Sequence, residues 1–151
     1  MLLYPIFLRL EGHRVLIVGA GPVAVRKAKG LIEAGAHVVV VAPAGDPEMA
    51  ELTVAWQHRE FESADLDGAD LVFAATNLRS LNRAIGEACR SRGIWANIAD
   101  SAEECDFQVP ARVNCEDVQI AISTGGADPK RASRLRKRFE QILSQACEHD
   151  V

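Results

Sequence analysis

The sequence predicts an α/β protein in which a parallel sheet carries helices on both faces. Mostly apolar runs at residues 15–18, 37–42 and 71–75 lack the alternation of a half-exposed strand, as is typical of parallel strands buried on both faces. Helical patterns at 22–34 and 78–92 alternate with these runs, which is the order of a doubly wound sheet. Aromatic residues make up only 5% of the chain, so an aliphatic core is expected.

The first predicted strand, residues 14–18, leads directly into a glycine turn and a helix. Gly19, Gly21 and Ala24 form the pattern G-x-G-x-x-A. The first glycine permits the turn, the second lets a pyrophosphate approach the backbone, and the alanine lets the helix pack closely on the strand. Pro22 suits the first helical position, and the first amides of the helix point towards the phosphates. The motif predicts a Rossmann-like, dinucleotide-binding fold; the alternative is such a fold without a ligand.

The helix predicted at 22–34 has apolar residues at helical spacing, and Gly35 is expected to end it. Four charged residues of this helix are expected to face the solvent: Arg26, Lys27, Lys29 and Glu33. The strand at 37–42 then completes one βαβ unit. A short helical turn at 48–52 and a third strand at 54–58 are expected to follow.

The strand at 71–75 is followed by an amphipathic helix at 78–92, which Gly93 is expected to end, and by another strand at 94–99. The residues of this helix expected to face the core are Leu81, Ile85, Ala88 and Cys89. An extended segment at 2–10 is expected to pair with the sheet or to cover it.

The C-terminal part departs from this alternation. Residues 107–113 and 118–123 look extended and are expected to form a small sheet outside the main one. Asp128 is a good N-cap, and Pro129 a good first residue, for a helix that runs to about residue 146. The apolar stripe of this helix consists of Ala132, Leu135, Phe139, Ile142, Leu143 and Ala146.

We expect the 151 residues to form a dinucleotide-binding domain over 1–112, followed over 113–151 by a small strand and a basic helix. The net charge of -4 argues against non-specific nucleic-acid binding. No apolar run reaches the roughly 18 residues that span a bilayer, and no signal peptide is recognisable, so a cytoplasmic protein without a membrane partner is expected. Neither a metal site nor a disulfide framework is expected, because the cysteines are widely spaced and lack a C-x-x-C pair. The cysteines are Cys89, Cys105, Cys115 and Cys147.

Ligands of such folds lie at the carboxyl ends of the strands, so the residues there are candidate contacts. Residues 42–44 hold neither the usual ribose-binding acid nor a Lys or Arg, so they do not separate NAD from NADP; Asp46 in the same loop is an alternative ribose ligand. The small residues of 74–77 would let the nicotinamide half lie against the backbone. The alternative is tight strand-to-helix packing, with Asn77 or Ser80 as a helix cap.

Two further features could contact a substrate. Asn97 and Asp100 follow the strand at 94–99, where a carboxylate could act as a general base; a solvated loop aspartate is the alternative. Six of the 17 Lys and Arg residues lie within nine positions, and they are Lys130, Arg131, Arg134, Arg136, Lys137 and Arg138. With the Gly125-Gly126 turn just before them they would suit a ligand with several carboxylates. A solvated helix face and a nucleic-acid site are alternatives, although no aromatic platform accompanies the cluster.

Motifs spread over residues 5–143 together match one known family. They are Pro5-Ile6-Phe7, Val18-Gly19-Ala20-Gly21-Pro22-Val23-Ala24 with Arg26-Lys27-Ala28, Glu33-Ala34-Gly35-Ala36, Ala74-Ala75-Thr76-Asn77, Asn97-Ile98-Ala99-Asp100, Phe107 with Pro110, and Ser123-Thr124-Gly125-Gly126 with Pro129. This set resembles the precorrin-2 dehydrogenase family, which includes the N-terminal part of siroheme synthases and works in siroheme and cobalamin synthesis.

The resemblance implies oxidation of precorrin-2 to sirohydrochlorin with NAD as the hydride acceptor. Asp100 matches the essential aspartate of the family, which removes a proton; in bifunctional members it also takes part in inserting Fe(II), a ferrochelatase (lyase) activity. The substrate carries acetate and propionate groups, which gives the basic helix a role. The expected substrate contacts are Asn97, Thr124, Gly125, Arg131 and Arg134.

For the cofactor, the resemblance implies contacts at Pro22, Val23, Pro43 and Ala44, and a missing ribose acid is usual in the family. The full set of expected cofactor contacts is Gly19, Gly21, Pro22, Val23, Pro43, Ala44, Thr76 and Asn77. Family members often form homodimers and continue into a helical region, so a truncated piece or a minimal member is expected. The rival function is an NAD-sensing regulatory module without catalysis, which explains the glycine motif equally well but leaves Asp100 and the basic helix without a role.

Overall fold

The computed structural model describes residues 3–147, and it divides the chain into two compact units. The first, which we call the sheet unit, is Ile6–Phe107. The second, the hairpin unit, consists of the described residues on either side of it, 3–5 and 108–147. The side chains of residues 146 and 147 lie outside the described part.

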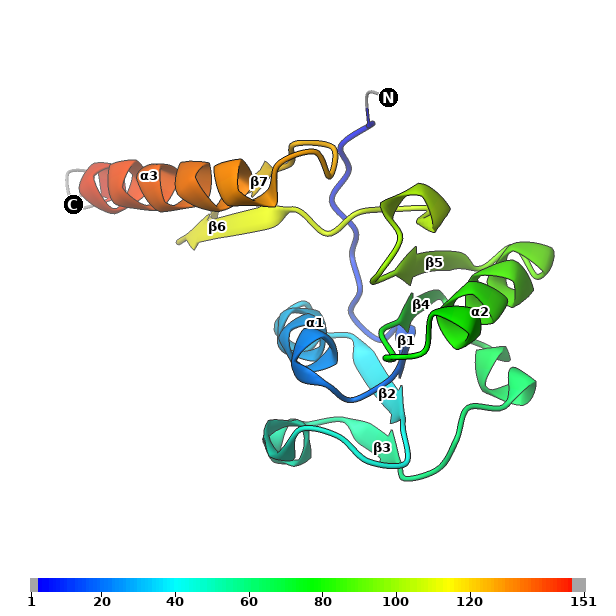
Figure 1. The fold of residues 1–151 in the computed structure, drawn as a ribbon. Coiled ribbons are helices and arrows are strands. Elements are labelled where there is room, and N and C mark those ends of the chain that lie inside the picture. Colours follow the sequence, from blue (N-terminus) through cyan, green and yellow to red (C-terminus); the bar gives the residue numbers. More distant parts are fainter. Residues whose placement is uncertain (1–2, 148–151) are drawn as a thin grey trace. The chain divides into compact units, whose positions relative to one another are not determined.

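The sheet unit contains five parallel strands in the order β3-β2-β1-β4-β5 (Figure 1). The strands are β1 (Arg14–Val18), β2 (His37–Val41), β3 (Ala55–Gln57), β4 (Leu71–Ala74) and β5 (Trp95–Ile98). Val18 at the end of β1 pairs with Val41 on one side and with Ala74 on the other. The chain builds outward from β1 to β3 and then crosses back to add β4 and β5. This reversal between β1 and β4 is a topological switch point, where such sheets bind ligands.

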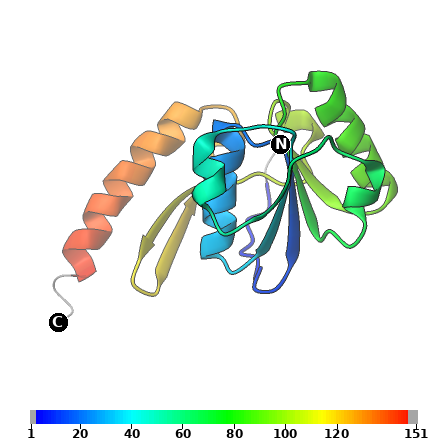
Figure 2. The same cartoon turned by 90° about the horizontal axis from the view of Figure 1, so that it is seen from below.

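Two helices cover opposite faces of the sheet, as Figure 2 shows. The first, α1 (Pro22–Glu33), packs on alternate β1 residues such as Val15 and Ile17, and the second, α2 (Arg79–Ser91), packs on the intervening ones such as Leu16. The remaining short helices are η1 (Pro47–Glu51), η2 (Ser63–Leu66) and η3 (Ala102–Glu104). The predicted α/β fold, with a parallel sheet between two helical layers, is confirmed.

The ends of α1 agree with the sequence. Pro22 is its first residue, and Gly35 lies just beyond its end with a positive φ of 76°. The N–H of Gly35 donates to Ile32 O at 2.9 Å, and the N–H of Ala36 donates to Leu31 O at 3.0 Å. This pair of hydrogen bonds is a Schellman motif, which requires the left-handed backbone that glycine adopts without strain.

The structure corrects two details of the sheet unit. Lys27 does not face the solvent, because its flexible stem crosses apolar surface and its amine reaches Asn97. The N-cap of α2 is Leu78, which forms no side-chain cap, so neither Asn77 nor Ser80 has that role. Residues 6–10 do not pair with the sheet, whereas Leu10 packs against the core on the α1 side, in agreement with the alternative that this segment covers the sheet.

The hairpin unit combines two antiparallel strands with one helix. Strands β6 (Ala111–Cys115) and β7 (Val118–Ile122) pair with Val113 opposite Ile120. The carboxylate of Asp128 accepts a hydrogen bond from the N–H of Arg131 at 2.8 Å, and α3 (Pro129–Cys147) starts at the next residue, as predicted. The small separate sheet is therefore also confirmed.

The apolar stripe of α3 is only partly covered. Ala132 is buried, and Leu135 and Leu143 are half-buried, but Phe139 and Ile142 are 38% and 57% exposed. The side chain of Ala146 lies outside the described residues. Within residues 3–147, no helix is both long enough and apolar enough to cross a membrane.

Candidate functional site

Gly19 marks the closest approach between the ends of β1 and β4. Its φ of 107° lies in the region that residues with a side chain rarely adopt, and a Cβ on it would lie 2.7 Å from the carbonyl carbon of Ala75. Because a carbonyl group of the backbone cannot move aside cheaply, only a hydrogen atom fits here. Gly19 is therefore required by the fold itself, and it lies at the switch point.

Gly21 differs from Gly19 because the fold does not require a glycine at this position. Its backbone is extended, with φ −78° and ψ −179°, and a Cβ on it would meet no atom within 4 Å. The space beside it lies in front of the first turn of α1, where the amides of Val23 and Ala24 have no acceptor within the helix. Pro22 and Val23 are exposed there. Open space beside Gly21, next to helix amides that have no acceptor within the helix, leaves room for the pyrophosphate of a dinucleotide.

The loop after β2 is attached to the glycine turn. A Cβ on Gly45 would lie 2.5 Å from Ala20 O, and the N–H of Asp46 donates to that oxygen at 2.8 Å. This contact holds the exposed Pro43 and Ala44 near the turn. Gly45 is a residue that the sequence analysis missed, because its role depends on a contact with a loop distant in sequence.

Two side chains secure the same end of the sheet. Asp46 Oδ1 accepts a hydrogen bond from the N–H of Glu48 at 3.0 Å, so this carboxylate caps η1. Trp56 on β3 donates its indole N–H to Ala42 O at 3.0 Å and stacks on His58, with 4.2 Å between the ring centroids. The sequence left open a ribose-binding role for Asp46; the structure adds the capping role.

Thr76 lies two residues beyond the end of β4. A buried asparagine of α2 forms hydrogen bonds with it. Asn82 is 0% exposed. Its Oδ1 accepts hydrogen bonds from the N–H of Thr76 at 3.1 Å and from its hydroxyl at 2.7 Å, and its Nδ2 donates to Thr76 O at 3.0 Å. Asn77, the next residue, is exposed. Asn82 was not among the predicted site residues, because a polar residue of a helix is normally expected to face water. Its helical spacing to the buried Ile85 and Cys89 is the signal that could have found it.

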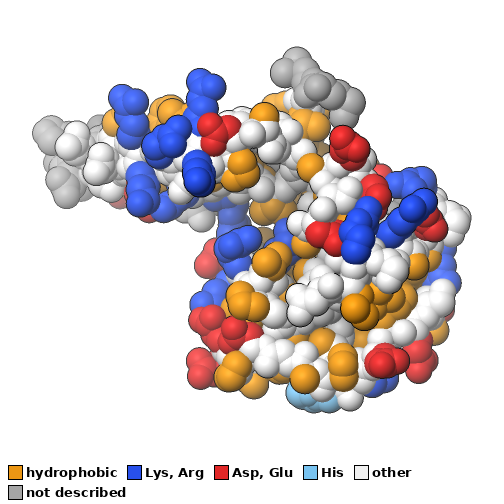
Figure 3. Space-filling view, viewed as in Figure 1, with side chains coloured by type: hydrophobic (Ala, Val, Ile, Leu, Met, Phe, Trp, Pro, Cys, Tyr) orange, Lys and Arg blue, Asp and Glu red, His pale blue; other side chains and the backbone are white. Residues whose placement is uncertain are grey.

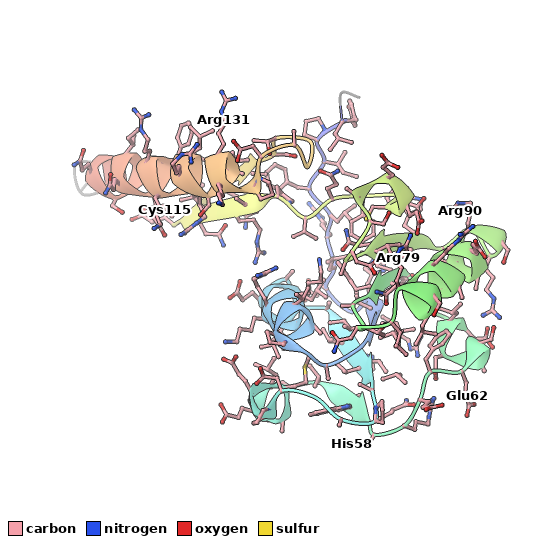
Figure 4. All side chains as sticks on the ribbon, in the orientation of Figure 1. His58, Glu62, Arg79, Arg90, Cys115 and Arg131 are labelled. Carbon is pink, nitrogen blue, oxygen red and sulfur yellow. The ribbon has the colours of Figure 1, made fainter. Side chains whose placement is uncertain are left out.

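Asp100 lies at the same edge, just beyond β5, and is held at both of its oxygens. Its Oδ2 accepts a hydrogen bond from Asn82 Nδ2 at 3.1 Å, and its Oδ1 lies 3.7 Å from Arg79 Nη1. Arg79, labelled in Figure 4, also pairs with Glu104, and that hydrogen bond is the main cause that raises the pKa of the guanidinium. The side chain of Asp100 remains 36% exposed. A carboxylate that is oriented but still open to solvent can accept a proton from a bound ligand.

Asn97 is placed differently from Asp100. It is 6% exposed, and its carboxamide donates to Phe107 O at 2.9 Å and accepts from Lys27 Nζ at 2.9 Å. The Lys27 amine also lies 4.9 Å from the ring centroid of Phe73. Burial lowers the pKa of Lys27, and the charge of Arg26 lowers it further. The carboxamide of Asn97 therefore bonds within the sheet unit.

The other predicted substrate contacts belong to the hairpin unit. Thr124 Oγ1 accepts a hydrogen bond from the N–H of Asp128 at 3.2 Å, and the N–H of Gly125 donates to Ser123 Oγ at 3.0 Å. Arg131 and Arg134 are exposed on α3, where Figure 3 shows Lys and Arg side chains gathered and Figure 4 shows Arg131 pointing outward.

Sequence comparison identifies the family of the chain. Residues 6–111 match the model of a family described as "Putative NAD(P)-binding". The chain belongs to this family. The prediction of a nicotinamide dinucleotide cofactor is thereby confirmed, and the open space beside Gly21 agrees with it.

The chain is also similar to parts of larger proteins. The chain is 44% identical over 147 residues to the siroheme synthase of Thioalkalivibrio sulfidiphilus and 43% identical over 145 residues to siroheme synthase 1 of Aeromonas salmonicida. These matches cover 95% and 93% of the chain but only 30% and 31% of the relatives. The solved structure of SirC, a precorrin-2 dehydrogenase, matches with a TM-score of 0.78 and 28% identity, over 92% of this chain and 70% of SirC.

Proposed function

We propose that this protein oxidises precorrin-2 to sirohydrochlorin in siroheme synthesis, with NAD as the hydride acceptor. The observation that carries the proposal is the place of Asp100: an oriented, partly exposed carboxylate at the same sheet edge as the glycine turn and Thr76. The likeness to SirC, a precorrin-2 dehydrogenase, and to siroheme synthases supports the choice of substrate. The chain spans 30% of the length of that siroheme synthase.

In this proposal the sheet unit holds the cofactor and removes the proton. The amides of Val23 and Ala24 bind the pyrophosphate in the space beside Gly21, and Pro43 and Ala44 flank the nucleotide. Thr76 and Asn77 line the nicotinamide half. Bound NAD supplies an acceptor for the hydride that leaves the macrocycle. The matching proton goes to the carboxylate of Asp100.

The hairpin unit contributes the groups that recognise the substrate. Precorrin-2 carries several carboxylates, and Arg131 and Arg134 form no ion pair within the described residues, whereas Arg136 pairs with Glu140. A free guanidinium binds a carboxylate through two parallel hydrogen bonds. We assign further substrate contacts to Thr124, Gly125 and Asn97.

Substitution of Asp100 tests the proposal. Wild-type protein incubated anaerobically with precorrin-2 and NAD should produce the absorbance of sirohydrochlorin, and Asp100→Ala should abolish it while NAD affinity stays within about twofold. Glu103→Gln, which neutralises an exposed carboxylate nearby, should leave turnover unchanged. Near-normal turnover by Asp100→Ala would refute the catalytic assignment. Wild-type protein that binds NAD but produces no sirohydrochlorin would favour the NAD-sensing alternative.

We propose that the protein can also insert Fe(II) into sirohydrochlorin. Fe(II) added to the same assay tests for ferrochelatase activity, which should also depend on Asp100.

We propose a homodimer that buries the exposed apolar side chains of the hairpin unit, among them Val118, Phe139 and Ile142. Four expectations stay predictions: the domain boundary between residues 112 and 113, the cytoplasmic location, the contribution to cobalamin synthesis, and the lack of nucleic-acid or membrane partners.

A further inference from the structure

The carboxamide of Asn82 links the two strand ends that form the proposed catalytic edge. Asn82 is the only residue of α2 that bonds to both Thr76 and Asp100 among the hydrogen bonds of residues 3–147. Through it, the loop after β4 and the carboxylate after β5 share one buried side chain. Its four hydrogen bonds occupy both lone pairs of Oδ1 and both hydrogens of Nδ2.

The orientation of this carboxamide is determined by its partners. The N–H of Thr76 can only donate and lies 3.1 Å from Oδ1, while Thr76 O can only accept and lies 3.0 Å from Nδ2. Rotation of the amide by 180° would place donor against donor and acceptor against acceptor. Asn82 therefore always presents a hydrogen, never a lone pair, to Asp100.

We propose that Asn82 is a positioning residue for the reaction, because it holds the Asp100 carboxylate ready to accept the substrate proton. The inference rests on the proposed function. A hydrogen bond to Oδ2 from a side chain without freedom to rotate restricts the carboxylate, while Arg79 attracts Oδ1. A carboxylate with a restricted orientation reacts faster than one that must first find its geometry. Because Asn82 also binds Thr76, the base keeps a constant place relative to the loop proposed to line the nicotinamide half.

Asn82→Asp replaces the hydrogen-bond donor that faces Asp100 by an acceptor, with little change in side-chain shape. The new carboxylate would keep its acceptor role towards Thr76 N–H, but its other oxygen would face Asp100 at about 3 Å. Repulsion between two carboxylates this close raises the pKa of one of them, so the pair holds a shared proton until the pH is raised. Two further charged groups lie near the pair: Arg79 on α2, whose guanidinium lies 3.7 Å from Asp100 Oδ1, and Glu104 on η3, which pairs with Arg79. The shared proton restores a donor towards Asp100, and it is lost as the pH rises.

The first measurement is thermal unfolding of the full chain in a double-mutant cycle of Asn82→Asp, Asp100→Asn and both together. Asn82→Asp should lower Tm by roughly 5–10 °C. Asp100→Asn should have a small effect, because its amide oxygen can still accept from Asn82. In the double variant the new carboxylate accepts from the amide at position 100, so a substantial part of the lost Tm should return. Strictly additive shifts would overturn the contact, whatever the activity.

The second measurement is kcat for sirohydrochlorin formation as a function of pH. Asn82→Asp should lower kcat at pH 8 by at least about tenfold, with KM for NAD changed less than about threefold, and activity should recover as the pH falls. Ile85→Val, a buried change in the same helix, should lose stability but keep the wild-type pH profile. If Asn82→Asp does not fold, Asn82→Ala removes the carboxamide donor without adding charge and should lower kcat more than it raises KM.

The outcomes separate this proposal from the function on which it rests. A wild-type pH profile and a wild-type kcat in the Asn82 variants would overturn the positioning role and leave the proposed function standing. Wild-type protein without turnover would overturn the proposed function and the positioning role together, while the stability cycle would still report the contact between Asn82 and Asp100.

Discussion

The amine of Lys27 donates to the carboxamide oxygen of Asn97 at 2.9 Å, which joins α1 to β5 across a face of the sheet. The pair is held in partly apolar surroundings, with the Phe73 ring centroid 4.9 Å from the amine. Burial lowers the pKa of Lys27 below its usual 10.5, with Arg26 acting in the same direction and Cys105 opposing it. The charged amine is therefore less favourable in the folded protein than in the unfolded chain.

Lys27 should make stability rise with pH on the alkaline side. Between the lowered folded-state pKa and 10.5 the unfolded chain binds more protons, so the free energy of unfolding increases as the pH rises through this window. Lys27→Met should lose that increase, as measured by urea unfolding at pH 7 and pH 10. Lys29→Met is the matched control, because Glu48 raises the pKa of Lys29 and its titration lies above this window. Equal pH dependence in wild type and Lys27→Met would contradict the prediction.

Substitution of Gly19 and substitution of Gly21 should have different effects, the first on stability and the second on NAD binding. Gly21→Ala should keep the wild-type Tm within about 2 °C, because the new Cβ meets no protein atom, and should weaken NAD binding by at least about tenfold, because it occupies the phosphate space. Gly19→Ala should lower Tm or prevent folding, since its Cβ would meet the Ala75 carbonyl. Calorimetric titration with NAD and thermal unfolding check both. Unchanged NAD affinity in Gly21→Ala would remove the pyrophosphate from this position.

The thiol of Cys89 should be inert in the folded protein. Its side chain is fully buried between α2 and the sheet, and this burial raises its pKa from 9.0 to about 11. At pH 8 only about one thiol in a thousand would be ionised, even if reagent could reach it. Alkylation with iodoacetamide, followed by peptide mass spectrometry, should label Cys89 at least about 100-fold more slowly than in 8 M urea. Rapid labelling under native conditions would show that α2 opens frequently.

Charge reversal at different positions of α3 should distinguish specific recognition of the substrate from non-specific electrostatic attraction. Arg131→Glu with Arg134→Glu should weaken sirohydrochlorin binding by at least about tenfold, in keeping with the loss of charge-assisted hydrogen bonds. Lys137→Glu with Arg138→Glu produces the same change in net charge further along the helix and should have a smaller effect. Fluorescence titration at two salt concentrations measures both. Equal losses in the two pairs would leave only a non-specific attraction.

The sheet and its two main helices could be predicted because their signals are local. Buried parallel strands are continuous apolar runs, and a glycine turn between a strand and a helix is recognisable from residues 15–24 alone. The helix η2 was not predicted, since it contains few apolar residues and depends on reciprocal hydrogen bonds between Glu62 and Asp65. Such a capping arrangement is short and leaves no periodic pattern.

The parts of the site that escaped prediction all depend on contacts between distant segments. Helical periodicity placed Lys27 on the solvent side, but its long stem lets the amine reach Asn97. Asn82 lies in the first turn of α2, three residues before Ile85 and seven before Cys89, so helical spacing places it on the buried face. Its polarity argued against burial, which the hydrogen bonds to Thr76 and Asp100 make possible. Gly45 resembles any loop glycine until the backbone of Ala20 is seen against it.

The hydrogen bond from Trp56 to Ala42 has an optical consequence. The indole is tied to the residue that precedes Pro43 and Ala44, which we propose to contact the nucleotide, whereas Trp95 lies half-exposed at the start of β5. Emission from Trp56 is therefore sensitive to any shift of the loop after β2, while emission from Trp95 provides a background that solvent quenchers suppress. The protein carries a native fluorophore next to the proposed nucleotide end of the site, and we expect that cofactor binding can be followed without a label.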